Sequence, residues 1–318
     1  MTAKKPVAMV SRAKEYLAYR RSLGFDLETS ALVLLDFARF ADRAGHRGPL
    51  TSALVLRWAT QSSEHSLRYH SERLSIARGF ARYLAARDAK TEIPDQRLLA
   101  GRFGRSQPHV YTDEQLGQLV SDTAKAAAID PLRRHTYATV FGLLASTGLR
   151  VSEALGLELT DVDLERGVLH VRRTKFRKSR LVPMHPSVTR AMGRYRGRRD
   201  QDPGCRESAW FFAGRHGRPL PYTSVRGAFL RLRTRLGWRS NGALPVPRIH
   251  DLRHTFACRR LLAWYREDVD VERGIVALST YLGHGKVTDT YWYLTGTSEL
   301  LAIAGDRFER FVATGSAS

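Results

Sequence analysis

The feature that most constrains the fold of this chain is a break in its apolar pattern at residues 98–110. That stretch places two glycines, a serine and a proline among arginines, a composition typical of a linker. The 318 residues are 43% hydrophobic, which is enough for a core on each side of the break. We therefore predict a first domain over residues 1–105 and a second over residues 112–318, joined by a linker that reaches to about residue 111.

The first hundred residues carry apolar side chains at helical spacing. One run ends at Gly24 and a second at Gly45, and glycine favours helix ends. Thr51 is placed to cap a short third helix, and the fourth helix puts Arg78 and Arg82 one turn apart on its polar face. The expected apolar face of that fourth helix is Leu67, Leu74, Ala77, Ala81 and Leu84. The pattern predicts a compact four-helix module.

Helical and strand-like runs alternate beyond the linker. A capping box at Thr112 starts a helix, and a later helix ends at Gly148, so that Arg150 falls in the first turn of the next one. Three strand-like runs follow, at residues 159–163, 168–172 and 179–182. A basic turn at residues 174–178 joins the last two, and helices resume after Pro186. The fold class that we predict is mainly α with a small antiparallel β-sheet.

The charge of the chain indicates a polyanionic partner. Its 52 Lys and Arg residues against 31 Asp and Glu give a formal charge of +21 and a pI near 10.6, which favours nucleic acid. Up to residue 105 there are 19 basic and 10 acidic residues, a net +9, which leaves 33 and 21, a net +12, for the rest. Because the excess is spread over both halves, we expect both domains to face the anion.

Cysteine content and hydropathy bear on compartment. Two cysteines, Cys205 and Cys258, exclude a disulfide framework and fit a reducing environment. We see no apolar run of roughly 18 residues and no apolar signal-peptide core at the N-terminus. We therefore expect a cytoplasmic protein, associated with the nucleoid if it is bacterial, that does not bind a membrane.

The densest group of chemically active side chains lies between residues 250 and 293. His250 and Arg253 are three residues apart on a predicted helix and share a face, so an acid or base and a guanidinium can approach one phosphate oxyanion together. His284 supplies another hydrogen-bond donor. Three tyrosines compete for the role of nucleophile, namely Tyr281, Tyr291 and Tyr293. This group of side chains predicts a reaction at a phosphate group.

Two cations outside this group are further candidates, each with an ordinary alternative. Arg150 opposes the dipole of the helix that it starts, which indicates either a bound anion or a common surface arginine. Lys175, in the basic turn, can act as a proton donor or belong to a solvated turn. His250, His254 and Cys258 recur every four residues and offer a rival metal trio, but we find no fourth ligand and expect no metal or cofactor.

The remaining basic residues are either solvated or contact DNA phosphates. The positions that we favour for DNA binding are Arg78, Arg82, Arg102, Arg105, Arg177, Lys178 and Arg226. A second basic group is expected on a DNA-facing or solvated surface and comprises Arg190, Arg194, Arg198 and Arg199.

Several segments in one order resemble the signature of the tyrosine recombinase (phage integrase) family. They are Ser-Thr-Gly-Leu-Arg-Val-Ser-Glu-Ala-Leu-Gly-Leu at 146–157, His-Asp-Leu-Arg-His-Thr-Phe at 250–256, Leu-Gly-His at 282–284, and a tyrosine nine residues after His284. The match covers about residues 112 to 295, and the N-terminal module resembles the SAM-like core-binding domain of that family. The resemblance therefore implies an α+β catalytic domain behind a helical DNA-binding domain.

This resemblance implies a role for each candidate. Arg150, Arg253 and His284 would stabilise the charge on the phosphodiester, and Tyr293 would attack it to form a 3′-phosphotyrosine. Because a tyrosine hydroxyl is protonated at neutral pH, a base is needed, and the family implies His250. In the same way Lys175 would protonate the departing 5′ oxygen.

The resemblance also implies a partner and an assembly. We expect a site-specific recombinase on double-stranded DNA that passes through a Holliday junction, and the segment from Tyr281 favours a transposon-encoded member. The alternatives are a type IB topoisomerase and a non-catalytic DNA-binding accessory protein. An amphipathic helix over residues 300–311 either packs on its own domain or docks on a neighbour in a homotetramer, with or without related recombinase subunits. Residues 259–280 have no assigned role.

Overall fold

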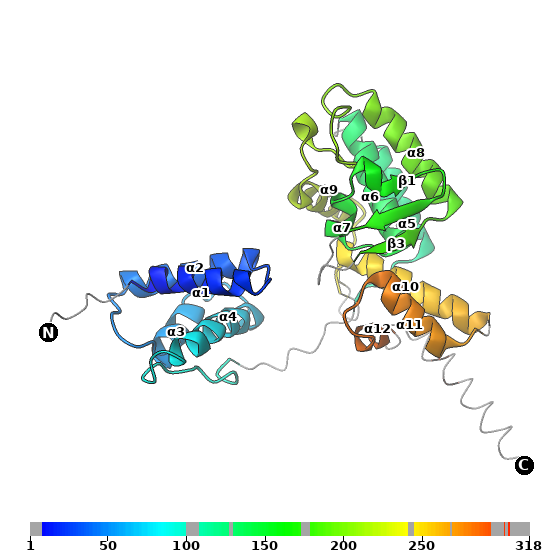
Figure 1. The fold of residues 1–318 in the computed structure, drawn as a ribbon. Coiled ribbons are helices and arrows are strands. Elements are labelled where there is room, and N and C mark those ends of the chain that lie inside the picture. The colour runs from blue at the N-terminus through cyan, green and yellow to red at the C-terminus, as the bar shows by residue number, and fades with distance from the viewer. Residues whose placement is uncertain are drawn as a thin grey trace, which may run out of the picture. The chain divides into compact units, whose positions relative to one another are not determined.

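The computed structural model describes residues 8–99, 108–126, 130–172, 179–240, 245–267 and 269–293, together with Ala302 and Gly305 (Figure 1). The chain divides into two compact units, Met1–Ser106 and Gln107–Ser318. Within the described ranges, no helix is long and apolar enough to span a bilayer.

The first unit is a helical module. Its helices are α1 (Met9–Ser22), α2 (Glu28–Arg43), α3 (Ser52–Ala59) and α4 (Leu67–Ala85). Phe37, Trp58 and Phe80 are fully buried between them. The predicted cap of α3 is confirmed, because the Thr51 side chain accepts a hydrogen bond from the Leu54 backbone N–H at 3.3 Å.

One predicted core position of this unit is wrong. Leu67 is half exposed, whereas the other four residues of the predicted apolar face of α4 are buried. Leu67 is the first residue of α4 and precedes the turns whose side chains enter the core. The predicted apolar face of α4 therefore begins one turn too close to the N-terminus of the helix.

The second unit packs helices around a small sheet. Its helices are α5 (Asp113–Ala124), α6 (Pro131–Thr147), α7 (Val151–Leu155), α8 (Pro186–Asp200), α9 (Tyr222–Arg235), α10 (Ile249–Arg266), α11 (Val271–Leu282) and α12 (Thr288–Tyr291), with short 3-10 turns η1 (Leu159–Asp161) and η3 (Arg215–Gly217). The strands β1 (Val162–Asp163), β2 (Val168–Val171) and β3 (Arg180–Pro183) form an antiparallel sheet in that order. The predicted fold class is confirmed.

The first strand-like run is shorter than predicted. Residues 159–161 form the 3-10 turn η1, and only Val162 and Asp163 pair with β2. The reason is local, since the Asp161 carboxylate accepts a hydrogen bond from the Glu158 backbone N–H at 3.0 Å and closes a tight turn. The pairing of Val171 with Arg180 confirms that β2 and β3 form a hairpin.

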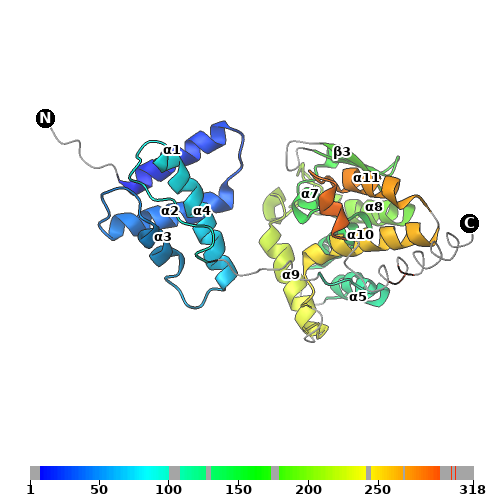
Figure 2. The same ribbon diagram turned by 90° about the horizontal axis from the view of Figure 1, so that it is seen from below.

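Helix α6 is the centre of the second unit. It contacts α5, α7, α8 and α10, and its Phe141 is buried against Phe229 of α9. The capping box predicted at Thr112 is confirmed, with Thr112 Oγ1 and Gln115 Oε1 each accepting the other residue's backbone N–H at 3.1 Å. Figure 2 shows α10 and α11 lying side by side. Cys258 of α10 and Leu278 of α11 are buried in the same hydrophobic cluster.

One arginine that was expected at the surface is fully buried. The Arg199 guanidinium donates hydrogen bonds to the carbonyls of Ser208 and Trp210, the latter at 2.9 Å, and pairs with Asp200. The loop after α8 folds over this side chain and presents carbonyl groups to it. The expectation of a DNA-facing or solvated Arg199 is therefore wrong, because the loop supplies the acceptors that a buried guanidinium needs.

Candidate active site

A left-handed glycine shapes the loop that carries Arg150. Gly148 ends α6 with φ +63°, and a Cβ at this position would lie 2.6 Å from the Phe256 ring, so only glycine fits. Arg150 precedes α7 as its N-cap residue and does not lie in the first helical turn, which corrects the sequence prediction. The helix starts one residue later because the Glu153 side chain accepts the Arg150 backbone N–H at 3.0 Å.

The second predicted arginine reaches the same place from α10. Arg253 is only 3% exposed and donates hydrogen bonds to the carbonyl oxygens of Gly148 at 2.9 Å and Leu282 at 2.7 Å. Burial lowers the pKa of this guanidinium, and the nearby Tyr293 hydroxyl opposes that shift. Arg253 therefore links Gly148, at the start of the loop that carries Arg150, to the end of α11 through hydrogen bonds.

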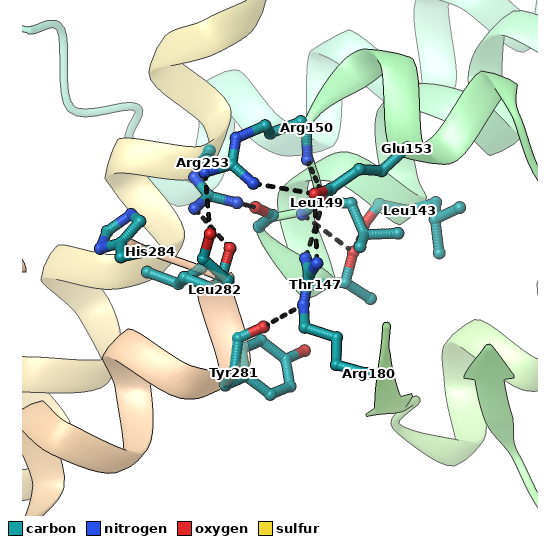
Figure 3. A network of polar contacts seen from close by, with 12 residues as sticks. Leu143, Thr147, Leu149, Arg150, Glu153, Arg180, Arg253, Tyr281, Leu282 and His284 are labelled. Atoms are coloured by element: carbon teal, nitrogen blue, oxygen red, sulfur yellow. Dashed lines mark hydrogen bonds and ion pairs between the residues drawn. The ribbon is translucent and has the colours of Figure 1, made fainter. Parts of the chain in front are cut away.

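The last turn of α11 is the point at which the site converges. Gly283 ends the helix with φ +67°, and three arginines from separate elements bind the carbonyl groups of this turn (Figure 3). The pairs are Arg180 with Tyr281 O at 2.6 Å, Arg253 with Leu282 O at 2.7 Å, and Arg150 with Gly283 O at 3.1 Å. The carbonyls at a helix C-terminus lack helical partners and carry negative partial charge, so cations suit this turn.

His284 follows this turn directly. Its Nδ1 lies 2.7 Å from the hydroxyl of buried Thr290, and its Nε2 lies 3.4 Å from the Tyr293 hydroxyl oxygen. Burial and the charges of Arg253 and Arg150 lower the pKa of His284 to about 4. The imidazole is therefore neutral at pH 7, and a Thr290 hydroxyl that donates to Nδ1 leaves the ring proton on Nε2.

Tyr293 is the tyrosine that the fold places against His284. It is 7% exposed, and its ring packs on His254 with centroids 4.8 Å apart and on His284 with centroids 5.8 Å apart. The Cys258 thiol lies 3.5 Å from the Tyr293 carbonyl oxygen. The other two tyrosines differ in setting, since Tyr291 is exposed and burial raises the pKa of Tyr281 to about 12.

The structure also locates His250 in the first turn of α10, one turn before Arg253. The residue remains exposed, but partial burial of the ring and then the charge of Arg253 lower the pKa of His250. A neutral imidazole at this position can accept a proton. The predicted site residue Lys175 lies outside the described residues.

Helix α10 offers no metal trio. Within the described part of the chain, no three His, Cys, Asp or Glu side chains are grouped so as to hold a metal ion. His254 faces the ring of Tyr293, and burial raises the pKa of the Cys258 thiol to about 12, so it is not available as a thiolate.

The predicted DNA-binding residues have different settings. Arg82 and Arg226 are exposed, whereas Arg78 is half-buried and donates a hydrogen bond to the Pro94 carbonyl at 2.8 Å. Arg78 therefore has a structural partner of its own. The other four positions lie outside the described residues and are Arg102, Arg105, Arg177 and Lys178.

Sequence reasoning missed two residues that organise this site. Glu153 bonds Arg150 and Arg180 simultaneously, and Arg180 joins β3 to both α7 and α11. The spacing of Glu153 three residues after Arg150 was a visible signal, since such residues are neighbours at a helix start. Arg180 gave no local signal, because its partners lie 27 and 101 residues away.

The sequence of this chain is similar to those of known proteins. The model of the phage integrase family matches residues 110–299. Two Sinorhizobium fredii proteins, y4rB and y4rE, have names that record an inferred integrase/recombinase activity. The protein y4rB is 40% identical, and the match covers 93% of this chain and 96% of y4rB. The protein y4rE is 37% identical, and the match covers 93% of this chain and 94% of y4rE. Tyrosine recombinase XerD of Brucella abortus is 29% identical over 70% of each chain.

Solved structures show the same fold. The Tn1549 transposon integrase in complex with a circular intermediate DNA aligns with a TM-score of 0.68 at 20% identity, covering 95% of this chain and 99% of that one. The XerH site-specific recombinase bound to a palindromic difH substrate aligns with a TM-score of 0.64 at 19% identity, covering 94% and 85%.

Proposed function

This chain belongs to the phage integrase family and is a tyrosine recombinase, and we propose that it cleaves and rejoins DNA through Tyr293. The observation that carries the proposal is the contact of the Tyr293 hydroxyl with His284 Nε2 at 3.4 Å, directly after the turn that binds Arg150 and Arg253. The proposed nucleophile, a neutral donor and two cations therefore meet at one helix end.

The substrate that we infer is a double-stranded DNA recombination site. The net charge of +21 suits a polyanion, and Arg82 and Arg226 are exposed. The Tn1549 integrase and XerH, which share the fold, were both solved with DNA. Contacts to phosphates would position the protein, and contacts to bases would select the site.

The two arginines are proposed to clamp the scissile phosphate. A guanidinium has five N–H donors, so the hydrogen bonds of Arg150 and Arg253 to carbonyl groups leave donors for phosphate oxygens. The non-bridging oxygens gain negative charge in the transition state, and preorganised cations stabilise it without having to move. Losing one such donor typically costs roughly 3 to 4 kcal/mol.

The covalent step exchanges one phosphoester bond for another. The Tyr293 oxygen attacks phosphorus and the bond to the 5′ oxygen breaks, which leaves a 3′-phosphotyrosine and a free 5′ hydroxyl. The tyrosine proton passes to neutral His250, and Lys175 supplies the proton for the 5′ oxygen. Because the energy of the broken bond is retained in the phosphotyrosine, a second DNA end can reverse the step without ATP.

The proposed assembly is a homotetramer that exchanges strands between two duplexes through a Holliday junction. The C-terminal segment, which lies almost entirely outside the described residues, would dock on a neighbouring protomer. The likeness to a transposon integrase supports integration or excision of a mobile element as the biological role.

A nicked suicide substrate tests the chemistry. A duplex selected by binding from a randomised library would carry a nick beside the cleavage point, so that the cut fragment is lost and the adduct accumulates. We expect an adduct with the native chain and with Tyr291→Phe, but none with Tyr293→Phe. An adduct with Tyr293→Phe would show that another residue is the nucleophile, and no adduct with the native chain would support a DNA-binding accessory role.

A further inference from the structure

We propose that Arg180 is a positioning residue that keeps the charge of Arg150 available to the scissile phosphate. The inference rests on the proposed function, because it names the residue that prepares one arm of the clamp. Arg180 begins β3, outside the motifs that carry the predicted site residues. It acts through Glu153 and through the α11 turn.

All three nitrogen atoms of the Arg180 guanidinium donate hydrogen bonds. Nη1 and Nη2 donate to the two carboxylate oxygens of Glu153 at 3.1 and 2.8 Å, and Nε donates to the Tyr281 carbonyl at 2.6 Å. The side chain is only 11% exposed. Figure 3 shows its guanidinium between the Glu153 carboxylate and the Tyr281 carbonyl. We therefore assign these contacts to the positioning of Glu153 and of the α11 turn, and not to the phosphate itself.

The charges of Arg150, Glu153 and Arg180 support the positioning role of Arg180. Glu153 also accepts a hydrogen bond from Arg150 Nη1 at 2.8 Å, so one carboxylate lies between two guanidinium groups. Burial raises the pKa of Glu153, but the hydrogen bonds from Arg180 and Arg150 outweigh it and the pKa is lowered. Because Arg180 balances this carboxylate, the charge of Arg150 is not cancelled by Glu153.

The packing at Gly283 supports the same role. A Cβ at Gly283 would lie 2.8 Å from Arg180 Nη1 and 3.1 Å from Cζ, so the guanidinium is pressed against the turn that precedes His284. The Gly283 carbonyl is in turn bound by Arg150. Removing Arg180 would therefore disturb both the charge of Arg150 and the support of the turn beside His284.

The test compares two substrates of the full chain. One is the nicked duplex selected from the randomised library, and the other is the same duplex with a methylphosphonate at the scissile position. Replacing a non-bridging oxygen by a methyl group removes the charge that the clamp stabilises. If Arg180 acts through the charge of Arg150, its loss should matter much less on the neutral substrate.

We expect Arg180→Met to slow adduct formation about 100-fold on the phosphate substrate at saturating protein, with a change of DNA Kd below about threefold. On the methylphosphonate, the gap to the native chain should shrink to less than about tenfold. Arg180→Lys, which keeps the charge but not the paired contacts, should lie between Met and native. If Arg180→Met does not fold, the rates of Arg180→Lys on the two substrates are compared with those of the native chain instead.

The matched control is Arg199→Met, which removes a buried arginine whose partners lie outside the site. It should lower the Tm while leaving the ratio of the two substrate rates as in the native chain. Native rates for the Arg180 variants, or an equal loss on both substrates, would overturn the inference. Failure of the native chain to form any adduct would instead overturn the proposed function.

Discussion

The Glu153 carboxylate binds Arg150 twice, accepting its side-chain Nη1 at 2.8 Å and its backbone N–H at 3.0 Å. Glu153 therefore sets both the start of α7 and the direction of Arg150, the first arginine of the proposed clamp. The side chain at this position has to meet two requirements. It must stay ionised while buried, and it must leave Arg150 able to bind the phosphate of the proposed substrate.

Glu153→Gln should slow adduct formation about 10- to 100-fold and reduce the free energy of unfolding by about 1 to 3 kcal/mol. The amide keeps one acceptor but places an NH₂ group against a guanidinium. Single-turnover cleavage and urea unfolding measure the two effects, with the exposed Glu165→Gln as the matched control. Equal values for Glu153→Gln and the control would contradict the shared role of Glu153.

The pH dependence of Glu153 has a definite sign. Its folded pKa is lowered, so its contribution to stability is complete above the ordinary glutamate pKa and is lost as pH falls through the folded value. The native chain should therefore lose more stability on acidification below about pH 5 than Glu153→Gln does. Parallel unfolding curves in urea would contradict this.

His254 gives a second and separate pH effect. Burial lowers its pKa to about 4, so the unfolded chain binds a proton between about pH 6.5 and 4 that the folded chain does not. Stability should fall over that range by up to about 3 kcal/mol more in the native chain than in His254→Phe. Its Nε2 has no hydrogen-bond partner among the described residues, so phenylalanine removes the titration without breaking a bond that the structure shows for that atom. Denaturant unfolding at several pH values measures the difference, and an identical slope in both proteins would count against it.

Sequence reasoning succeeded where the cause is local. The cap at Thr112 and the helix end at Gly148 depend on residues within a few positions, and both are confirmed. The same holds for the hairpin of β2 and β3. The family motifs then placed four site residues in one order, and the fold brings Arg150, Arg253, His284 and Tyr293 to the end of α11.

The errors arose where tertiary contacts decide. Arg199 looked like its neighbours in α8, but a later loop buries it, and Arg180 is defined by a glutamate and a carbonyl from other elements. Within the segment 259–280, which had no assigned role, residues 259–266 form the end of α10 and residues 271–280 form most of α11. Their position explains the spacing between Arg253 and His284, because α11 must return along α10 to bring His284 to the site.

Thr290 is predicted to set the ring proton of His284. Thr290→Val removes the hydroxyl beside Nδ1, so the proton is no longer held on Nε2, and adduct formation should fall about tenfold. Thr290→Ser keeps the hydroxyl and should stay within about threefold of the native rate. Equal rates for the valine and serine variants, measured at saturating protein, would contradict this role.

The C-terminal segment is predicted to hold the tetramer together. Deleting residues 298–318 should reduce assembly on DNA, as measured by analytical ultracentrifugation with the selected duplex. Binding of a single protomer should persist, because the exposed arginines Arg82 and Arg226 remain. Unchanged tetramers after the deletion would show that the segment packs on its own domain.

The most direct test of the central claim is the identity of the residue that becomes attached to DNA. Digestion of the native adduct with trypsin and then with nuclease should leave a nucleotide on the peptide of residues 287–307, which contains both Tyr291 and Tyr293. Fragmentation in a mass spectrometer separates these two positions. The nucleotide is predicted on Tyr293, and its recovery on Tyr291, or on a peptide that contains Tyr281, would contradict the assignment of the nucleophile.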